Sequence, residues 1–414
     1  MAAVSRQLDR GRHQRDTAQH HRQARARPAG LGGAVQLVLT EEQELLAGIV
    51  ADFAEERSPV ARFRALRDAG DPVGFSKPLW KEMAELGWAG IPFPESLGGA
   101  GLGLAELAVV MEALGRRLAP EPFLSSVLLG GQAVLQGGSE AQRSRWLAPL
   151  VAGDAFLALA FQEPRSRYDL FRVACRAERA GAGWRLTGEK VQVLDGLVAD
   201  ALIVVVRTAG AEADADGITL FLVDAGASGL TRERQHRVDT RGAARIVLDG
   251  VEVGDAGLVG GEGQGGALLE AVVDCATVGL CAELLGLMSE CFERTLTYLK
   301  DRVQFGVPIG SFQALKHRAA EMFIEVELAR SCVMAAARAV DAGADDAARL
   351  VSLAKARCSD AAVLVTNEAV QMYGGIGMTD EHDIGFFMKR ARAACQTFGD
   401  AVTHRARWAR LGGY

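Results

Sequence analysis

The sequence predicts an α+β protein with an N-terminal α-helical domain, a middle β-barrel or β-sheet domain and a C-terminal four-helix bundle. Three observations predict this order. Apolar residues recur at helical spacing up to about residue 153, short β-rich runs separated by Gly, Asp and Pro continue to residue 253, and long helical patterns fill the rest. A length of 414 residues suffices for two or three packed units.

Composition excludes several classes of protein. Hydrophobic residues make up 49% of the chain and charged residues 24%, which is typical of a globular protein. A formal net charge of −6 offers no attraction to phosphate backbones, so we expect no nucleic-acid binding. Charged residues such as Asp274 and Glu283 interrupt the most apolar segments, so we expect no membrane span. The seven cysteines form no C-x-x-C pair, which favours free thiols in a cytoplasmic protein.

Residues 1–34 differ from the rest of the chain. They hold seven Arg against two Asp, so they carry a charge of +5 and the remaining 380 residues carry −11. Because large apolar side chains are almost absent, this segment cannot bury enough surface to fold. We expect a disordered basic extension there.

The N-terminal helical domain is expected over residues 35–153. Thr40 with Gln43, and Ser139 with Gln142, are capping boxes that open helices. Pro59 is expected to end the first helix. Further helices are expected after Ser76 and from Leu104 to Leu118.

The middle β-domain is expected over residues 154–253. The spacing of its apolar runs is typical of an antiparallel sheet or barrel. The expected strands are 156–162, 172–179, 184–188, 201–207, 218–223 and 244–248.

The C-terminal domain, residues 254–414, is expected to be a bundle of long amphipathic helices. The expected helices are 267–300, 311–342, 346–373 and 384–410.

Two connections within this bundle carry residues suited to a ligand. Asp301–Ile309 places an Arg, an amide and an aromatic ring side by side, a set suited to a pyrophosphate and an adjoining flat ring. Three glycines in Gln371–Met378 let a ligand or another chain approach the backbone closely. Each segment alone is equally compatible with an ordinary connection between helices.

Together with these segments, the chain from about Val35 to the C-terminus resembles the acyl-CoA dehydrogenase family. The resemblance rests on the domain order and on six motifs. They are the run Leu86–Gly101, Gln162-Glu163-Pro164, Gly188-Glu189-Lys190, Arg302-x-Gln304-Phe305-Gly306-x-Pro308-Ile309, Ser311-Phe312-Gln313 and Thr397-Phe398-Gly399-Asp400. Within the family, Ala160–Asp169 is most similar to bacterial pimeloyl-CoA dehydrogenase small subunits.

The resemblance implies an FAD flavoprotein of fatty-acid metabolism that oxidises an acyl-CoA to its trans-2-enoyl-CoA, as a dimer or tetramer, and passes electrons to an electron-transfer flavoprotein. In family dimers, one chain holds the isoalloxazine and its neighbour contributes residues to the pyrophosphate and adenosine. The matching residues are Arg302, Gln304, Phe305, Gln313, Gln371, Gly374 and Gly375. The resemblance also assigns Gln162 and Asp400 to the cofactor site.

The catalytic base departs from the family pattern. The family's usual Glu aligns with Phe398, and the alternative position on the first bundle helix aligns with Ala276, so neither position offers a proton acceptor. Asp274 is the nearest carboxylate and is our candidate for the base. However, two residues along a helix turn its side chain by about 200° from the position of Ala276.

The positions that serve a chain's own flavin depart as well. The family's Trp-x-Thr aligns with Gln192-Val193-Leu194, and Gln162 stands where a Thr is expected. The residues that would contact the FAD of a neighbouring chain match the family, whereas the residues that would contact the chain's own flavin do not. The sequence therefore favours a base-lacking subunit that completes the cofactor site of a homologous sister chain. Two alternatives remain: a homo-oligomeric dehydrogenase with a displaced carboxylate, Asp274 or Glu270, and an FAD-free scaffold subunit.

Overall fold

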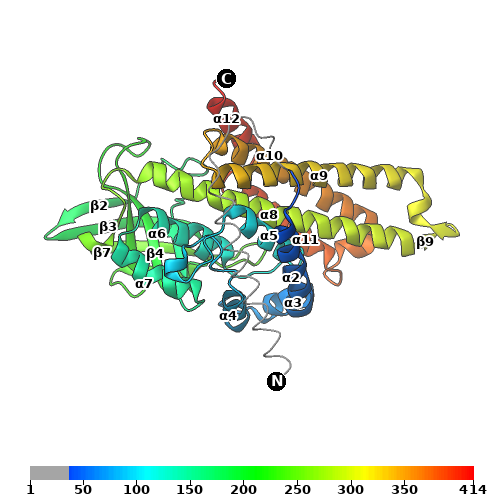
Figure 1. The fold of residues 1–414 in the computed structure, drawn as a ribbon, viewed down its shortest axis with the longest axis horizontal. Coiled ribbons are helices and arrows are strands. Elements are labelled where there is room, and N and C mark those ends of the chain that lie inside the picture. Colours follow the sequence, from blue (N-terminus) through cyan, green and yellow to red (C-terminus); the bar gives the residue numbers. More distant parts are fainter. Residues whose placement is uncertain (1–36) are drawn as a thin grey trace.

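The computed structural model describes residues 37–414, so the expected basic extension over 1–34 lies outside the described residues. The chain forms N-terminal helices, a middle sheet and C-terminal helices, as the sequence predicts. In Figure 1 the sheet lies at one end of the molecule, and the long bundle helices extend from it to a small hairpin, β9–β10 (Val303–Gln304 and Val307–Pro308), at the other end.

The N-terminal region is helical, and both predicted capping boxes are present at Thr40 and Ser139. The first helix ends at Arg57, as Pro59 predicts, but a further helix follows at once because proline is tolerated at a helix start. The elements are α2 (Glu41–Arg57), α3 (Val60–Ala69), α4 (Lys77–Glu85), η1 (Glu95–Leu97), α5 (Leu104–Gly115), the π-helical η2 (Phe123–Gly131), α6 (Gln132–Gly137) and α7 (Glu140–Val151). The sequence did not predict α3, η2 or α6.

The middle region contains an eight-stranded sheet, in which six strands overlap the predicted ones. Its strands are β1 (Leu157–Ala160), β2 (Arg176–Ala180), β3 (Gly183–Leu194), β4 (Ala201–Arg207), β5 (Ile218–Asp224), β6 (Leu230–Arg234), β7 (Ala243–Gly254) and β8 (Leu258–Val259). The short 3-10 turn η3 (Asp255–Gly257) precedes β8. The sheet is mostly antiparallel, but β1 and β2 each pair with β4 in parallel, which the sequence did not predict. The short strands β6 and β8 were also missed.

The bundle contains α8 (Gly265–Asp301), η4 (Ile309–Ser311), α9 (Gln313–Asp341), α10 (Ala347–Tyr373), η5 (Gly374–Met378), α11 (Ile384–Gln396) and α12 (Ala401–Leu411). The predicted single helix over 384–410 is wrong, because the chain breaks between α11 and α12. Phe398 and Gly399 have φ angles of 62° and 113° there. The buried Lys355 amine donates hydrogen bonds to the carbonyl oxygens of Cys395 and Gly399, which holds the break in place.

Helix α8 is the central element of the core. By length and composition it is the one helix between residues 37 and 414 that would suffice to cross a membrane, yet 83% of its most apolar stretch is buried inside the protein. A core helix of a globular protein has the same character.

Helices α5 and α8 cross with their backbones in close approach. A Cβ added at Gly115 would overlap the backbone of Glu283, and one at Gly286 would overlap the carbonyl oxygen of Glu112. The two glycines therefore set the distance between the N-terminal helices and the bundle.

We predict that Gly286→Ala lowers the free energy of unfolding by about 1–3 kcal/mol, because the added methyl group forces the two helices apart. Urea denaturation measures this change. Gly48→Ala is the matched control, because Gly48 lies within α2 with nothing within 4 Å of an added Cβ. It should be neutral or stabilising by about 0.5–1 kcal/mol. Equal losses in both variants would contradict the close-approach argument.

Candidate functional site

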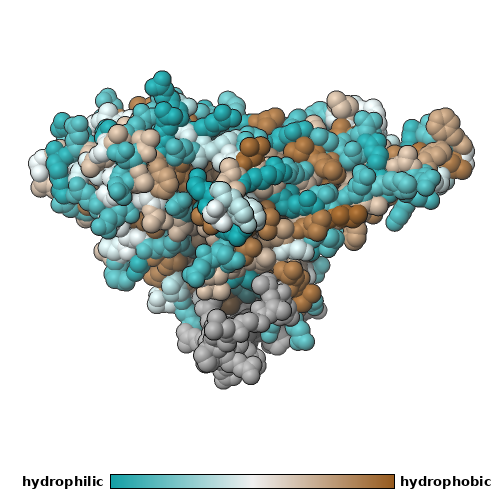
Figure 2. Space-filling model, turned by 90° about the horizontal axis from the view of Figure 1, so that it is seen from above, coloured by the Kyte–Doolittle hydropathy of each residue, from teal (hydrophilic) through white to brown (hydrophobic). Residues whose placement is uncertain are grey.

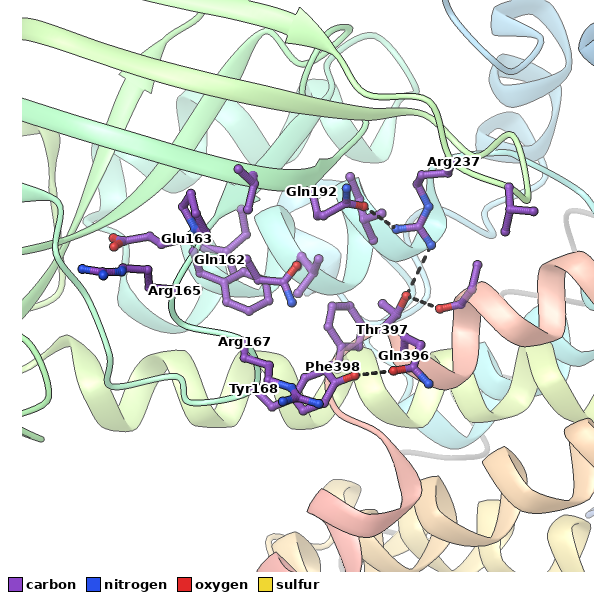
Figure 3. A pocket seen from close by; sticks show the side chains of 18 of the residues that line it. Gln162, Glu163, Arg165, Arg167, Tyr168, Gln192, Arg237, Gln396, Thr397 and Phe398 are labelled. Atoms are coloured by element: carbon purple, nitrogen blue, oxygen red, sulfur yellow. Dashed lines mark hydrogen bonds between the residues drawn. The ribbon is translucent and has the colours of Figure 1, made fainter.

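A pocket of about 660 Å³ lies where the sheet meets the end of α11. Its walls come from η2, β1, β3, the loop after β1, the loop between β6 and β7, and the end of α11 with the α11–α12 break. The apolar side chains of the wall include Leu129, Leu159, Phe161, Val191, Leu194 and Phe398. Polar side chains, among them Gln162, Gln192 and Arg237, complete the wall (Figure 3). A volume of this size suits a small-molecule ligand.

The one carboxylate that lines this pocket is held by other groups. Glu163 pairs with Lys190 at 2.6 Å, and its oxygens also accept hydrogen bonds from the backbone N–H groups of Ala174 and Cys175. Burial opposes the charged carboxylate, but Lys190 and the two N–H groups outweigh this and lower the pKa of Glu163. A carboxylate held this way is a poor proton acceptor.

Phe398 lies centrally in the pocket, where the sequence comparison expected a Glu. Its ring is 6.2 Å from that of Phe161, measured between centroids. Below it in Figure 3, Tyr168 donates a hydrogen bond to Gln396, which links the loop after β1 to α11. The floor of the pocket is therefore aromatic, and neither Phe161 nor Phe398 can accept a proton.

Asp274 does not line the pocket. Both of its oxygens accept hydrogen bonds from Arg407 on α12, at 2.7 and 2.8 Å. Burial raises the pKa of Asp274, and Arg407 opposes that rise. Glu270 lies 3.8 Å from the same guanidinium, and Ala276 is fully buried. Asp274 and Glu270 on α8 therefore form ion pairs with Arg407 on α12.

The residues predicted to be donated to a neighbour gather elsewhere. Because α8, α9 and α10 alternate in direction, the end of α8, the start of α9 and the end of α10 share one end of the bundle (Figure 1). Tyr298 and Tyr373 stack there with centroids 4.3 Å apart. All seven predicted residues are exposed at this end: Arg302, Gln304, Phe305, Gln313, Gln371, Gly374 and Gly375. We call this set the donor end.

The donor end is remote from the pocket of its own chain. Helix α11 leads from it toward the pocket, and its 13 residues extend roughly 20 Å at about 1.5 Å per residue. Apolar side chains are visible at the tip in Figure 2, where Phe305 is 93% exposed. Phe305 and Gly306 form the hairpin turn with φ angles of 54° and 80°. The Phe305 ring makes an edge-to-face contact with Phe312 of its own chain, with centroids 6.1 Å apart, and the rest of it stays exposed in this strained turn.

The chemistry of the donor end fits the diphosphate and adenosine of FAD. An added Cβ at Gly374 or Gly375 would meet no atom within 4 Å, so a phosphate can approach the bare backbone. Arg302 supplies a cation, and Phe305 a flat ring. The pocket fits the isoalloxazine less well, because Leu194 lacks a hydroxyl and the Gln192 side chain accepts from Arg237.

The two other predicted cofactor residues are separated. Gln162 lines the pocket, whereas Asp400 caps α12 by accepting hydrogen bonds from the backbone N–H and the hydroxyl of Thr403, both at 2.8 Å. Sequence reasoning missed the cationic lining residues, Arg165, Arg167 and Arg237. The closely spaced Arg165 and Arg167 were a visible signal, but nothing in the sequence placed Arg237 in the lining of the same pocket.

Three family models match the chain. The acyl-CoA dehydrogenase N-terminal, middle and C-terminal domain models match residues 40–154, 158–251 and 263–411. An acyl-CoA dehydrogenase of Bacillus subtilis (strain 168) is 31% identical over 359 residues, which are 86% of this chain and 93% of that protein.

Solved structures share the fold. The ChsE4-ChsE5 complex from Mycobacterium tuberculosis contains a chain with a TM-score of 0.82 and 29% identity, and the match covers 91% of this chain and 98% of that one. PigA, solved with FAD and proline, has a TM-score of 0.85 and 26% identity, with 91% and 99% covered. FAD is the cofactor that these findings support.

We predict that Glu163→Gln lowers the free energy of unfolding by about 3–5 kcal/mol, because it leaves the buried Lys190 without a counter-ion. Glu189→Gln is the matched control, because Glu189 pairs with the more exposed Arg245 and should change stability by about 1 kcal/mol or less. Chemical denaturation of the three proteins measures both changes.

The effect of Glu163 should also depend on pH. Because its pKa is lowered below the ordinary value of 4.5, its stabilisation is complete above about pH 4.5 and is lost as the pH falls through the folded-state pKa. The stability difference between the wild type and Glu163→Gln should therefore shrink below pH 4.5. A difference that stays constant down to pH 3 would contradict the assignment.

Proposed function

This chain belongs to the acyl-CoA dehydrogenase family, and we propose that it is the base-lacking subunit of a heteromeric enzyme that dehydrogenates an acyl-CoA thioester between its α and β carbons. The single observation that carries this proposal is the pocket wall. Its one carboxylate, Glu163, is bound to Lys190, and Phe398 stands at the family's usual base position. Removal of the weakly acidic proton α to a thioester requires a positioned base.

The alternative base positions support the same conclusion. Ala276, at the alternative position on the first bundle helix, is fully buried on α8. The Asp274 carboxylate forms an ion pair with the Arg407 guanidinium. A displaced carboxylate would have to leave this ion pair and cross to the pocket.

The donor end supplies the positive part of the proposal. Its exposed Arg302, Phe305 and Gly374 would hold the diphosphate and adenosine of an FAD whose isoalloxazine lies in the sister chain. The ChsE4-ChsE5 structure is a complex of two named chains, which supports a heteromeric arrangement for this chain by similarity. When bound, FAD supplies the two-electron acceptor for the dehydrogenation, while this chain's residues anchor and orient it.

The proposal also covers the cellular compartment and the electron acceptor. We place the enzyme in the cytoplasm, where the free cysteines found throughout residues 37–414 stay reduced, and we assign an electron-transfer flavoprotein as its electron acceptor.

Flavin stoichiometry tests the proposal. We predict that co-expression with a homologous chain carrying Glu at the position of Phe398 yields a complex with one FAD per two chains, measured by flavin absorbance against protein concentration. The isolated chain should not oxidise an acyl-CoA. One FAD per chain with activity in the isolated protein would favour the homo-oligomeric alternative, and a complex without flavin would favour the scaffold alternative.

We predict that Arg302→Ala and Phe305→Ala each weaken FAD binding by the complex roughly tenfold or more, because a charge-assisted contact and a stacking contact are lost. Fluorescence titration of the flavin-depleted complex measures the change. Both residues are exposed, so unfolding temperatures should stay unchanged. Arg405→Ala on α12 is the control, because Arg405 is also exposed but pairs with Asp360 away from the donor end. Equal FAD affinity in all variants would contradict the donor role.

A further inference from the structure

A buried series of alternating charges ends at the pocket. Arg237 donates to Asp239 at 3.0 Å, and the other oxygen of Asp239 lies 3.2 Å from Arg390. Arg390 in turn donates to Glu283 at 3.0 Å, and Glu283 accepts from Arg241 at 2.7 Å. We call these five residues the ion series. It joins the loop between β6 and β7 to α8 and α11.

The ion series holds three cations and two anions. The side chains of Asp239 and Arg390 are each 1% exposed, and those of Glu283 and Arg241 are 6% and 7% exposed. Asp195 adds a third buried carboxyl group, which accepts a hydrogen bond from Ser125. Burial raises the pKa of Asp195 to about 6, while the charges of Arg241, Arg237 and Arg390 oppose that rise. Buried charges are stable only when they are paired, and these carboxyl groups compensate the arginines inside the protein.

Arg237 is the end of the ion series that reaches the pocket. Figure 3 shows its two terminal nitrogens turned toward Gln192 and Thr397. Both hydrogen bonds are 3.4 Å long and go to neutral oxygens, so they are weak. A carboxylate or phosphate could replace both acceptors, because the guanidinium fork matches two oxygens of an anion.

Other residues that line the pocket also favour an anionic ligand. Arg165 and Arg167 also line it, and Arg165 has no ion pair or hydrogen bond anywhere in residues 37–414. The lining carboxylate, Glu163, is neutralised by Lys190. The pocket is therefore cationic around an apolar floor formed by Phe161 and Phe398, within a protein of negative net charge.

We propose that this pocket binds a small anionic ligand, an apolar chain or ring that carries a carboxylate or phosphate, with the anionic group on Arg237 and the apolar body on Phe398. The inference rests on the proposed function in one respect, which is that the chain's own flavin does not fill the pocket. A base-lacking subunit would then keep its pocket as a ligand site separate from the dehydrogenation.

Isothermal titration calorimetry of the full chain with decanoate, decyl phosphate and decan-1-ol tests the proposal. These probes share the apolar chain and differ in the head group. We expect at least one anion to bind roughly tenfold or more tightly than the alcohol, and the tighter anion identifies the head group. Equal affinity for all three, or no binding of any, would overturn the inference.

Variants locate the head group. Arg237→Gln should abolish the preference for the anion, while Arg185→Gln, an exposed β3 residue outside the pocket, should leave it unchanged. Should Arg237→Gln unfold, Phe398→Glu leaves the ion series intact and places a carboxylate in the pocket. It should reduce anion affinity roughly tenfold or more, because the new carboxylate competes for Arg237 and repels the anionic group of the ligand. An unchanged anion preference in a folded variant of either kind would overturn the assignment.

A failure of this inference can be distinguished from a failure of the proposed function. One tightly bound FAD per isolated chain would contradict the base-lacking role and give the pocket to flavin. Equal affinity for the three probes, in a chain that still forms a complex with one FAD per two chains, would contradict this inference alone.

Discussion

The contact on which the site most depends is the buried pair between Arg390 and Glu283, because it joins α11 to α8 beneath the pocket. Removing either partner would leave an uncompensated charge in the interior, which typically costs about 3–5 kcal/mol. Arg390 also forms an ion pair with Asp239, and Glu283 forms one with Arg241. Because Asp239 and Arg241 lie in the β6–β7 loop, the same pair also fixes that loop. The wall that carries Arg237 is therefore held by electrostatics as well as by packing.

The site has two separate parts, and each has its own chemistry. The pocket has an aromatic floor and cationic side chains, but its carboxylate is committed to Lys190. The donor end has bare glycine backbone, a guanidinium and a largely exposed aromatic ring. In the proposed function, a second chain supplies the base and holds the flavin ring, and the donor end of this chain binds the diphosphate and adenosine of the same FAD.

Local sequence signals predicted much of the fold. The capping boxes at Thr40 and Ser139 form hydrogen bonds between residues three positions apart. The start of each of these helices can therefore be predicted from a few neighbouring residues in the sequence. The break at Phe398 was missed, because Lys355, some 40 residues earlier, holds it through carbonyl oxygens. The parallel pairing of β1 with β4 was missed for a related reason, since period-two patterns do not specify which strand lies alongside.

The sequence by itself determined the family and the order of the domains, because these depend on residue type at motif positions, and it led to the hypothesis that Phe398 and Ala276 replace a base. Only the tertiary structure decided that Asp274 is bound to Arg407, that Glu163 is bound to Lys190, and that Arg237 ends a series of buried charges in the pocket. The physical reason is that a charged group takes its role from the neighbours that the fold brings within about 4 Å, and those neighbours lie up to 160 residues away along the chain.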